Sequence, residues 1–161
     1  MLKIGFAINS LAPSQLSYYL VREINRFLSE SKNANTDIVL FQQEVHTPRQ
    51  MPLCAVMHIN EMWGFDGVLI PTSVATALKS IRVPGPKFKL FYPYTLEWIR
   101  PQPTAYASFA PAYTAQGLQI VARNQDHADI IGNCFNRKVV GLVEDFRLSE
   151  LMEIIKSAHI D

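Results

Sequence analysis

Ten polar side chains that could bind a ligand or transfer a proton come directly after apolar segments of the chain. They are Asn9, Ser10, Thr72, Ser73, Tyr94, Thr95, Glu97, Arg123, Asn124 and His127. Hydroxyl and amide groups can orient a polar ligand, and a guanidinium can clamp a phosphate or carboxylate with two hydrogen bonds. Glu97 and His127 are the candidate acid and base, since both side chains can exchange protons with a substrate. The other eight are candidate ligand-binding residues.

Several of these groups also have a structural interpretation. Arg123 can form a salt bridge with Asp126 or Asp145. The hydroxyl of Thr72 or Ser73 can cap the helix predicted to follow it, and capping alone would explain that hydroxyl. An uncapped helix start would instead present free N–H groups to an anion. Arg123 is therefore the residue best suited to a functional test, because a role in ligand binding and a role in a salt bridge predict different effects of its mutation.

Strands and helices alternate along the chain. The predicted strands are Leu2 to Ile8, Asp37 to Phe41, Gly67 to Ile70, Lys87 to Tyr92, Leu118 to Ala122 and Lys138 to Val143. The predicted helices begin after Ser14, at Pro52, at Val74, at Asp126 and near Leu148, each with apolar residues at helical spacing. This alternation predicts an α/β class: one three-layer Rossmann-like domain over residues 1–161, with a mostly parallel sheet of about six strands. In such sheets ligands bind at the carboxyl ends of the strands, which is where the ten polar residues fall.

Composition and missing motifs narrow the function classes. The chain has 161 residues, of which 48% are hydrophobic. Its formal net charge of +1 provides no overall electrostatic attraction to nucleic acid or anionic lipid. No segment approaches the roughly 20 apolar residues that span a bilayer, and the first residues do not resemble a signal peptide, so we expect a cytoplasmic protein without membrane contact. Cys54 and Cys134 are predicted to be reduced core residues within helices. No dinucleotide fingerprint, P-loop, nucleophile elbow or zinc motif occurs, and we expect no cofactor and no metal.

The segment from Pro93 to Gly117 is rich in proline and aromatic residues, which limits long regular elements. Such a segment can form a binding wall, form a surface for a protein partner, or simply close the core. Its aromatics, with Arg100 and Lys89 nearby, could stack on bases, but without a basic stripe or a nucleic-acid motif we disfavour nucleic acid as a partner.

Four pieces of the sequence together resemble a known family. The pieces LKIGFAINS, GFDGVLIPTS, KFKLFYPYTLEW, and LQIVARNQDHADII followed by KVVGLVEDF resemble in kind and order the N-terminal Rossmann-like half of GT-B glycosyltransferases. The likeness is nearest to small glycosyltransferase-like proteins of tailed phages. Where that family often carries His or Asp, this chain has Tyr94 and Thr95, and where it often carries Ser, this chain has Asn124. In the family a second domain holds most of the nucleotide-sugar donor, and we expect no room for it here.

The resemblance implies a non-catalytic binding or assembly module, with phage proteins among its relatives. Residues Pro93 to Tyr113 would contact a protein partner or a second copy. The alternative is a minimal or split glycosyltransferase that takes a nucleotide sugar, with Arg123 and Ser73 on its phosphate and Glu97 or His127 as acid or base. A flavodoxin-like ligand domain is a third possibility. Its strand order would be 2-1-3-4-5 rather than 3-2-1-4-5-6.

Overall fold

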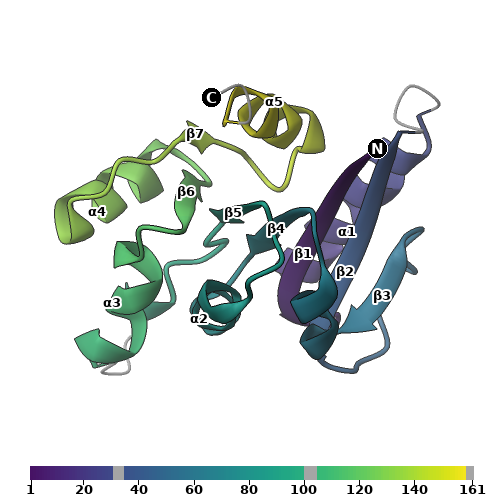
Figure 1. Cartoon of the computed structure of the whole chain (residues 1–161), viewed down its shortest axis with the longest axis horizontal. Helices are drawn as coiled ribbons and strands as arrows, with labels where there is room; N and C mark the ends of the chain where they lie inside the picture. The colour runs from purple at the N-terminus through teal and green to yellow at the C-terminus, as the bar shows by residue number, and fades with distance from the viewer. Residues whose placement is uncertain (31–34, 100–104, 159–161) are drawn as a thin grey trace.

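Seven strands of the described residues form a single sheet in which every neighbouring pair is parallel. The computed structural model describes residues 1–30, 35–99 and 105–158 (Figure 1). The strands are β1 (Leu2–Ser10), β2 (Thr36–Glu44), β3 (Ala55–His58), β4 (Val68–Pro71), β5 (Phe88–Phe91), β6 (Gln119–Ala122) and β7 (Gly141–Leu142). The helices are α1 (Gln15–Leu28), α2 (Val74–Arg82), α3 (Tyr106–Thr114), α4 (Gln125–Phe135) and α5 (Leu148–Ala158), with short 3-10 helices η2 (Ile59–Gly64) and η3 (Glu97–Ile99).

The strand order is β3-β2-β1-β4-β5-β6-β7. Its first six positions follow the 3-2-1-4-5-6 arrangement, so the flavodoxin-like prediction is wrong. In the centre of the sheet Phe6 of β1 lies opposite Leu40 of β2 and Ile70 of β4. These strands are covered on both faces, which explains their continuous apolar runs. The predicted three-layer, Rossmann-like α/β class is confirmed.

Helices α1 and α5 cover one face of the sheet, and η2, α2, α3 and α4 cover the other. On the first face Leu20 and Ile24 of α1 share a core with Leu151 of α5. On the second face Ala77 of α2 and Ile131 of α4 belong to one aromatic-rich core, while η2 covers the β1 and β2 end of the sheet. The connection that follows β1 (α1) and the connection that follows β4 (α2) therefore lie on opposite faces of the sheet, and this arrangement positions the candidate site.

Three helices begin with a side-chain cap. The Ser14 side chain accepts a hydrogen bond from the Ser17 N–H, the Ser73 side chain accepts one from the Thr76 N–H, and the Asn124 side chain accepts one from the His127 N–H. Each bond satisfies a backbone donor that the first turn of a helix leaves without a partner. The cap of α2 is thus Ser73. Thr72 instead donates its hydroxyl to the carbonyl of Ala7.

The helix predicted from Pro52 is wrong. Residues Ala55–His58 form the edge strand β3, paired with β2, and only the 3-10 helix η2 follows. A short apolar run fits a strand as well as a helix, and pairing with β2 decides in favour of the strand. The predicted cysteine environments are right only in part: both thiols are free and Cys134 lies in a helix, but neither is fully buried and Cys54 is not in a helix. Cys54 precedes β3 and is half-buried, while Cys134 lies on α4 and is exposed.

The aromatic segment mostly closes the core. Residues Tyr106–Thr114 form α3 despite Pro111, and Tyr113 is fully buried with its ring stacked 4.6 Å from that of Phe135. Trp98 stacks on Phe109 with a centroid distance of 5.5 Å. Arg100, Pro101 and Pro103 lie outside the described residues. The predicted contact surface therefore loses most of its aromatic side chains to the interior.

None of the described helices is long and apolar enough to cross a membrane.

Candidate functional site

A crevice lies at the carboxyl ends of β1, β4 and β5. The strand order reverses between β1 and β4, and the two connections leave on opposite faces there, which opens a space above the strand ends. This switch-point crevice has a volume of about 350 Å³. It is lined by Asn9, Ser10, Ala12, Ser14, Gln15, Leu16, Thr72, Ser73, Tyr94, Thr95 and Glu97. Seven of the ten predicted site residues are thus brought together, whereas Arg123, Asn124 and His127 do not line it.

Backbone hydrogen bonds hold the three loops of the crevice together. The Thr72 N–H donates to the Ala7 carbonyl at 3.0 Å, and the Tyr94 N–H donates to the Thr72 carbonyl at 3.3 Å. The Ser73 hydroxyl donates to the side-chain oxygen of Asn9 at 3.0 Å. An amide oxygen is a poor proton acceptor compared with an imidazole or a carboxylate, so Ser73 is held as a structural hydroxyl rather than activated as a nucleophile.

Glu97 occupies the start of helix α2, where the sequence suggests that free N–H groups could bind an anion. Its carboxylate accepts a hydrogen bond from the N–H of Val74, the first residue of α2, at 3.2 Å. A carboxylate at this position satisfies a free donor and complements the positive end of the helix dipole. A phosphate at the same place would meet the negative charge of Glu97. The start of α2 is therefore occupied by a carboxylate rather than open to a phosphate.

Arg123 reaches the edge of the crevice through Tyr94. Its guanidinium lies 4.4 Å from the centre of the Tyr94 ring, a cation–π distance. Two of its nitrogens donate to one carboxylate oxygen of Asp145, at 2.7 and 3.1 Å, and the Tyr94 hydroxyl donates to the same oxygen. Burial raises the pKa of Tyr94, which keeps that hydroxyl protonated as a donor. The salt bridge to Asp145, one of the two structural interpretations of Arg123, is present.

Asp145 and Phe146 have an uncommon backbone conformation. Their φ angles are 44° and 61°, in the left-handed region that side chains with a Cβ rarely adopt. The conformation turns Asp145 toward Arg123 and sends Phe146 into the core. There the Phe146 ring packs against Phe6, Tyr92 and Tyr94 at centroid distances of 6.2, 4.6 and 5.1 Å. The turn thus places the Phe146 ring against Tyr94, which lines the crevice, and holds the Tyr94 side chain in position.

His127 lies on the first turn of α4 rather than in the crevice. Burial lowers its pKa below the usual value, the positive charge of Arg123 lowers it further, and Asp126 opposes both effects. Its Nδ1 is buried and has no hydrogen-bond partner among the described residues. The imidazole is therefore neutral near pH 7, and it does not meet Glu97 in one pocket as a catalytic pair would.

Replacing His127 with glutamine is expected to make stability less sensitive to acid. Because the folded-state pKa of His127 is depressed, the unfolded chain binds a proton first as the pH falls below about 6.5, and the native state loses stability there. Urea unfolding between pH 7.5 and 5.5 (about one unit either side of that value) should show a shallower decline for His127→Gln than for wild type. The control His46→Gln changes an exposed loop residue and should follow wild type. Equal slopes for wild type and His127→Gln would contradict the assignment.

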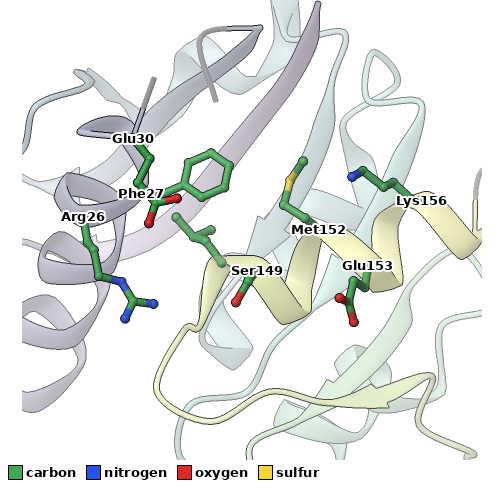
Figure 2. A pocket seen from close by; sticks show the side chains of 8 residues that line it. Arg26, Phe27, Glu30, Ser149, Met152, Glu153 and Lys156 are labelled. Atoms are coloured by element: carbon green, nitrogen blue, oxygen red, sulfur yellow. The ribbon is translucent and has the colours of Figure 1, made fainter. Parts of the chain in front are cut away.

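A second, larger groove of about 530 Å³ runs between α1 and α5 (Figure 2). Figure 2 shows Phe27 of α1 pointing across it toward Met152 of α5. Its charged residues balance, with Arg26 and Lys156 against Glu30 and Glu153. This groove lies along a helix seam, away from the strand ends, and its lining offers no net charge to a ligand.

Arg26, on the rim of that groove, pairs with a buried acid. Its guanidinium lies 2.6 Å from the carboxylate of Glu23, whose second oxygen lies 3.2 Å from Arg22. Glu23 is only 2% exposed. Glu23 is therefore not part of the solvent-exposed face of α1. Its carboxylate instead pairs with Arg22 and Arg26 of the same helix.

No cluster of three or more His, Cys, Asp or Glu side chains that could hold a metal ion occurs in the part of the chain that is described. No protein-family model, curated protein or solved structure matches this chain significantly.

Two contributors to the site were not predicted from the sequence. The crevice wall includes Ala12, Ser14, Gln15 and Leu16 from the start of α1. The turn after the first predicted strand was the available signal for them. The contact of Glu97 with the start of α2 had no such signal, because it joins residues 23 positions apart through the ends of two strands.

Proposed function

We propose that this chain is a non-catalytic binding module, related to the acceptor half of GT-B glycosyltransferases, that recognises a neutral, hydroxyl-bearing ligand in the switch-point crevice. The observation that carries the proposal is the Glu97 carboxylate on the N-terminus of α2. It places carboxylate oxygens, which accept hydrogen bonds from hydroxyl groups, in the lining of the crevice, and it occupies the helix start at which a phosphate would bind. Asn9, Ser10 and Thr95 supply further donors and acceptors around it. Sugars and other polyols match this set of groups.

The positions of the candidate catalytic residues support binding over sugar transfer. Glu97 is engaged with α2, His127 does not line the crevice, and the hydroxyl of Ser73 donates to an amide oxygen. Catalysis by acid and base needs both groups within hydrogen-bond reach of the reacting atoms. The split glycosyltransferase remains the second candidate, because Arg123 stacks on Tyr94 and so lies beside the crevice. Release from Asp145 would let its guanidinium reach a phosphate.

Titrations followed by two-dimensional 15N NMR test the proposal. Wild type is titrated with glucose, N-acetylglucosamine, inorganic phosphate and UDP-glucose. We expect the neutral sugars to shift the amide signals of Asn9, Ser10, Val74 and Thr95, and phosphate to leave them in place. If no neutral sugar moves these signals, the proposed ligand class is wrong. Binding of UDP-glucose that Arg123→Ala abolishes would favour the transferase over the module.

Glu97→Gln provides the matched test of the charge. Glutamine can still accept the hydrogen bond from the Val74 N–H, so the helix start should remain intact while the negative charge disappears. We expect this variant to gain weak binding of phosphate in the crevice. The control Glu153→Gln, on α5, removes the same charge outside the crevice and should not gain it.

A further inference from the structure

A third groove lies between η2 and α2 and runs along one side of α2 from Ala75 to Arg82. It has a volume of about 430 Å³. Its floor is apolar and already well packed, since Ile59, Met62 and Val83 are each at most 2% exposed. Trp63 and Leu78 form its apolar walls. The three floor side chains support the groove from beneath, and its accessible apolar surface comes from Trp63 and the partly exposed Leu78.

Trp63 is 58% exposed on the wall of the groove. The other tryptophan, Trp98, is packed against Phe109 and Phe135. An exposed tryptophan leaves a large apolar area in contact with water, and this residue type is enriched among those that dominate binding energy in protein interfaces. Its position beside a preformed apolar floor indicates a docking surface rather than an isolated surface residue.

The charge of the groove is entirely positive. Lys79 and Arg82 line it from the last turn of α2, both are exposed, and the groove has no acidic lining residue. Neither has a carboxylate within salt-bridge distance among the described residues, unlike Arg26, Arg123 and Arg147 elsewhere.

A cation in the last turn of a helix often interacts with the free carbonyl groups at the helix C-terminus. In α2 this interaction is made by Lys89, which is not part of the helix, rather than by Lys79 or Arg82. The ammonium group of Lys89 lies 2.6 Å from the carbonyl of Val83 and 3.4 Å from that of Ile81. The charges of Lys79 and Arg82 thus remain available to a partner.

We propose that the basic groove, defined by Ile59, Met62, Trp63, Leu78, Lys79, Arg82 and Val83, docks a peptide segment of another protein that carries bulky apolar residues flanked by carboxylates. The apolar side chains would pack against Trp63 and Leu78, and the carboxylates would pair with Lys79 and Arg82. This surface takes over the partner-binding role that the sequence predicts for Pro93 to Tyr113, whose aromatics are largely buried. The assignment does not depend on the ligand of the crevice, because the groove and the crevice have no lining residue in common.

Selection from a random 12-residue peptide library displayed on phage tests the proposal. The bait is the full chain, and Lys79→Glu/Arg82→Glu serves for counter-selection. We expect enriched peptides to combine acidic with bulky apolar residues. Synthetic copies should bind wild type about tenfold or more tighter than the double variant, with affinity falling as salt rises. The control Lys138→Glu changes an exposed lysine outside the groove and should bind like wild type.

Fluorescence reports where the peptides bind. Desolvation of Trp63 should shift the protein emission to shorter wavelength on binding, and Trp63→Phe should remove that shift. The proposal is overturned if no sequence is enriched, if enriched peptides lack acidic residues, or if they bind Lys79→Glu/Arg82→Glu as tightly as wild type. Sedimentation in the absence of peptide provides a further check. If the wild type self-associates and Lys79→Glu/Arg82→Glu does not, the groove binds a second copy of this chain and the proposal is overturned.

Discussion

Replacing Phe146 with alanine is expected to lower the free energy of unfolding by about 3–5 kcal/mol. The side chain is fully buried, and its ring is stacked on that of Tyr94 with an interplanar angle of 8°. Its loss leaves a cavity that Phe6 and Tyr92 border from other sides. Because Tyr94 lines the crevice, ligand binding should weaken as well. Urea unfolding followed by circular dichroism measures the change.

Phe146→Gly separates the ring from the backbone. Glycine at an ordinary position is about 0.5–1 kcal/mol less stable than alanine in a regular element. At Phe146 the φ angle is 61°, which glycine adopts without strain and alanine does not. We therefore expect Phe146→Gly to be at least as stable as Phe146→Ala. A glycine variant clearly less stable than the alanine variant would show that the left-handed turn is absent in solution.

Gly67→Ala is expected to destabilise the protein by about 1–3 kcal/mol through overpacking. A Cβ at this buried position would lie 2.4 Å from the carbonyl oxygen of Lys3 and 2.7 Å from the Phe65 ring. The nearest atom belongs to the backbone of β1, so relief requires β4 to move away from its neighbour. The resulting loss should appear in thermal and urea unfolding alike.

Gly117→Ala is the matched control, because a Cβ there would have no atom within 4 Å. Both glycines have negative φ angles, so the comparison isolates crowding from backbone strain. The control should stay within about 0.5 kcal/mol of wild type. Similar losses in the two variants would contradict the close packing of β1 on β4.

The sequence predicted a helix or strand correctly where the residues of that element alone contained the signal. Buried strand β1 and helices α1, α2 and α4 were predicted close to their observed bounds, because an apolar run or stripe coincided with a capping residue. The gathering of Asn9, Thr72 and Tyr94 followed from topology alone, since the carboxyl ends of parallel strands share one edge.

Local signals failed where tertiary contacts decided the outcome. The apolar spacing of Ala55 to Trp63 suits a helix, yet pairing with β2 makes its first part a strand. Helix α3 has a proline inside it and no side-chain cap at its start, and packing of Phe109 and Tyr113 supports it instead. The strand predicted from Lys138 shortens to Gly141–Leu142 at the sheet edge. The left-handed turn at Asp145 had no glycine or asparagine to indicate it.

The pairing of α1 with α5 has a consequence for the order of folding during synthesis. These helices lie near opposite ends of the described sequence, yet Leu20 and Ile24 share one core with Leu151 and Ile155. A nascent chain that has not yet emerged past residue 147 leaves this face of the sheet half covered, with apolar side chains open to chaperones or to aggregation. The central strands can pair early, but the layer that protects them is completed only when α5 joins α1.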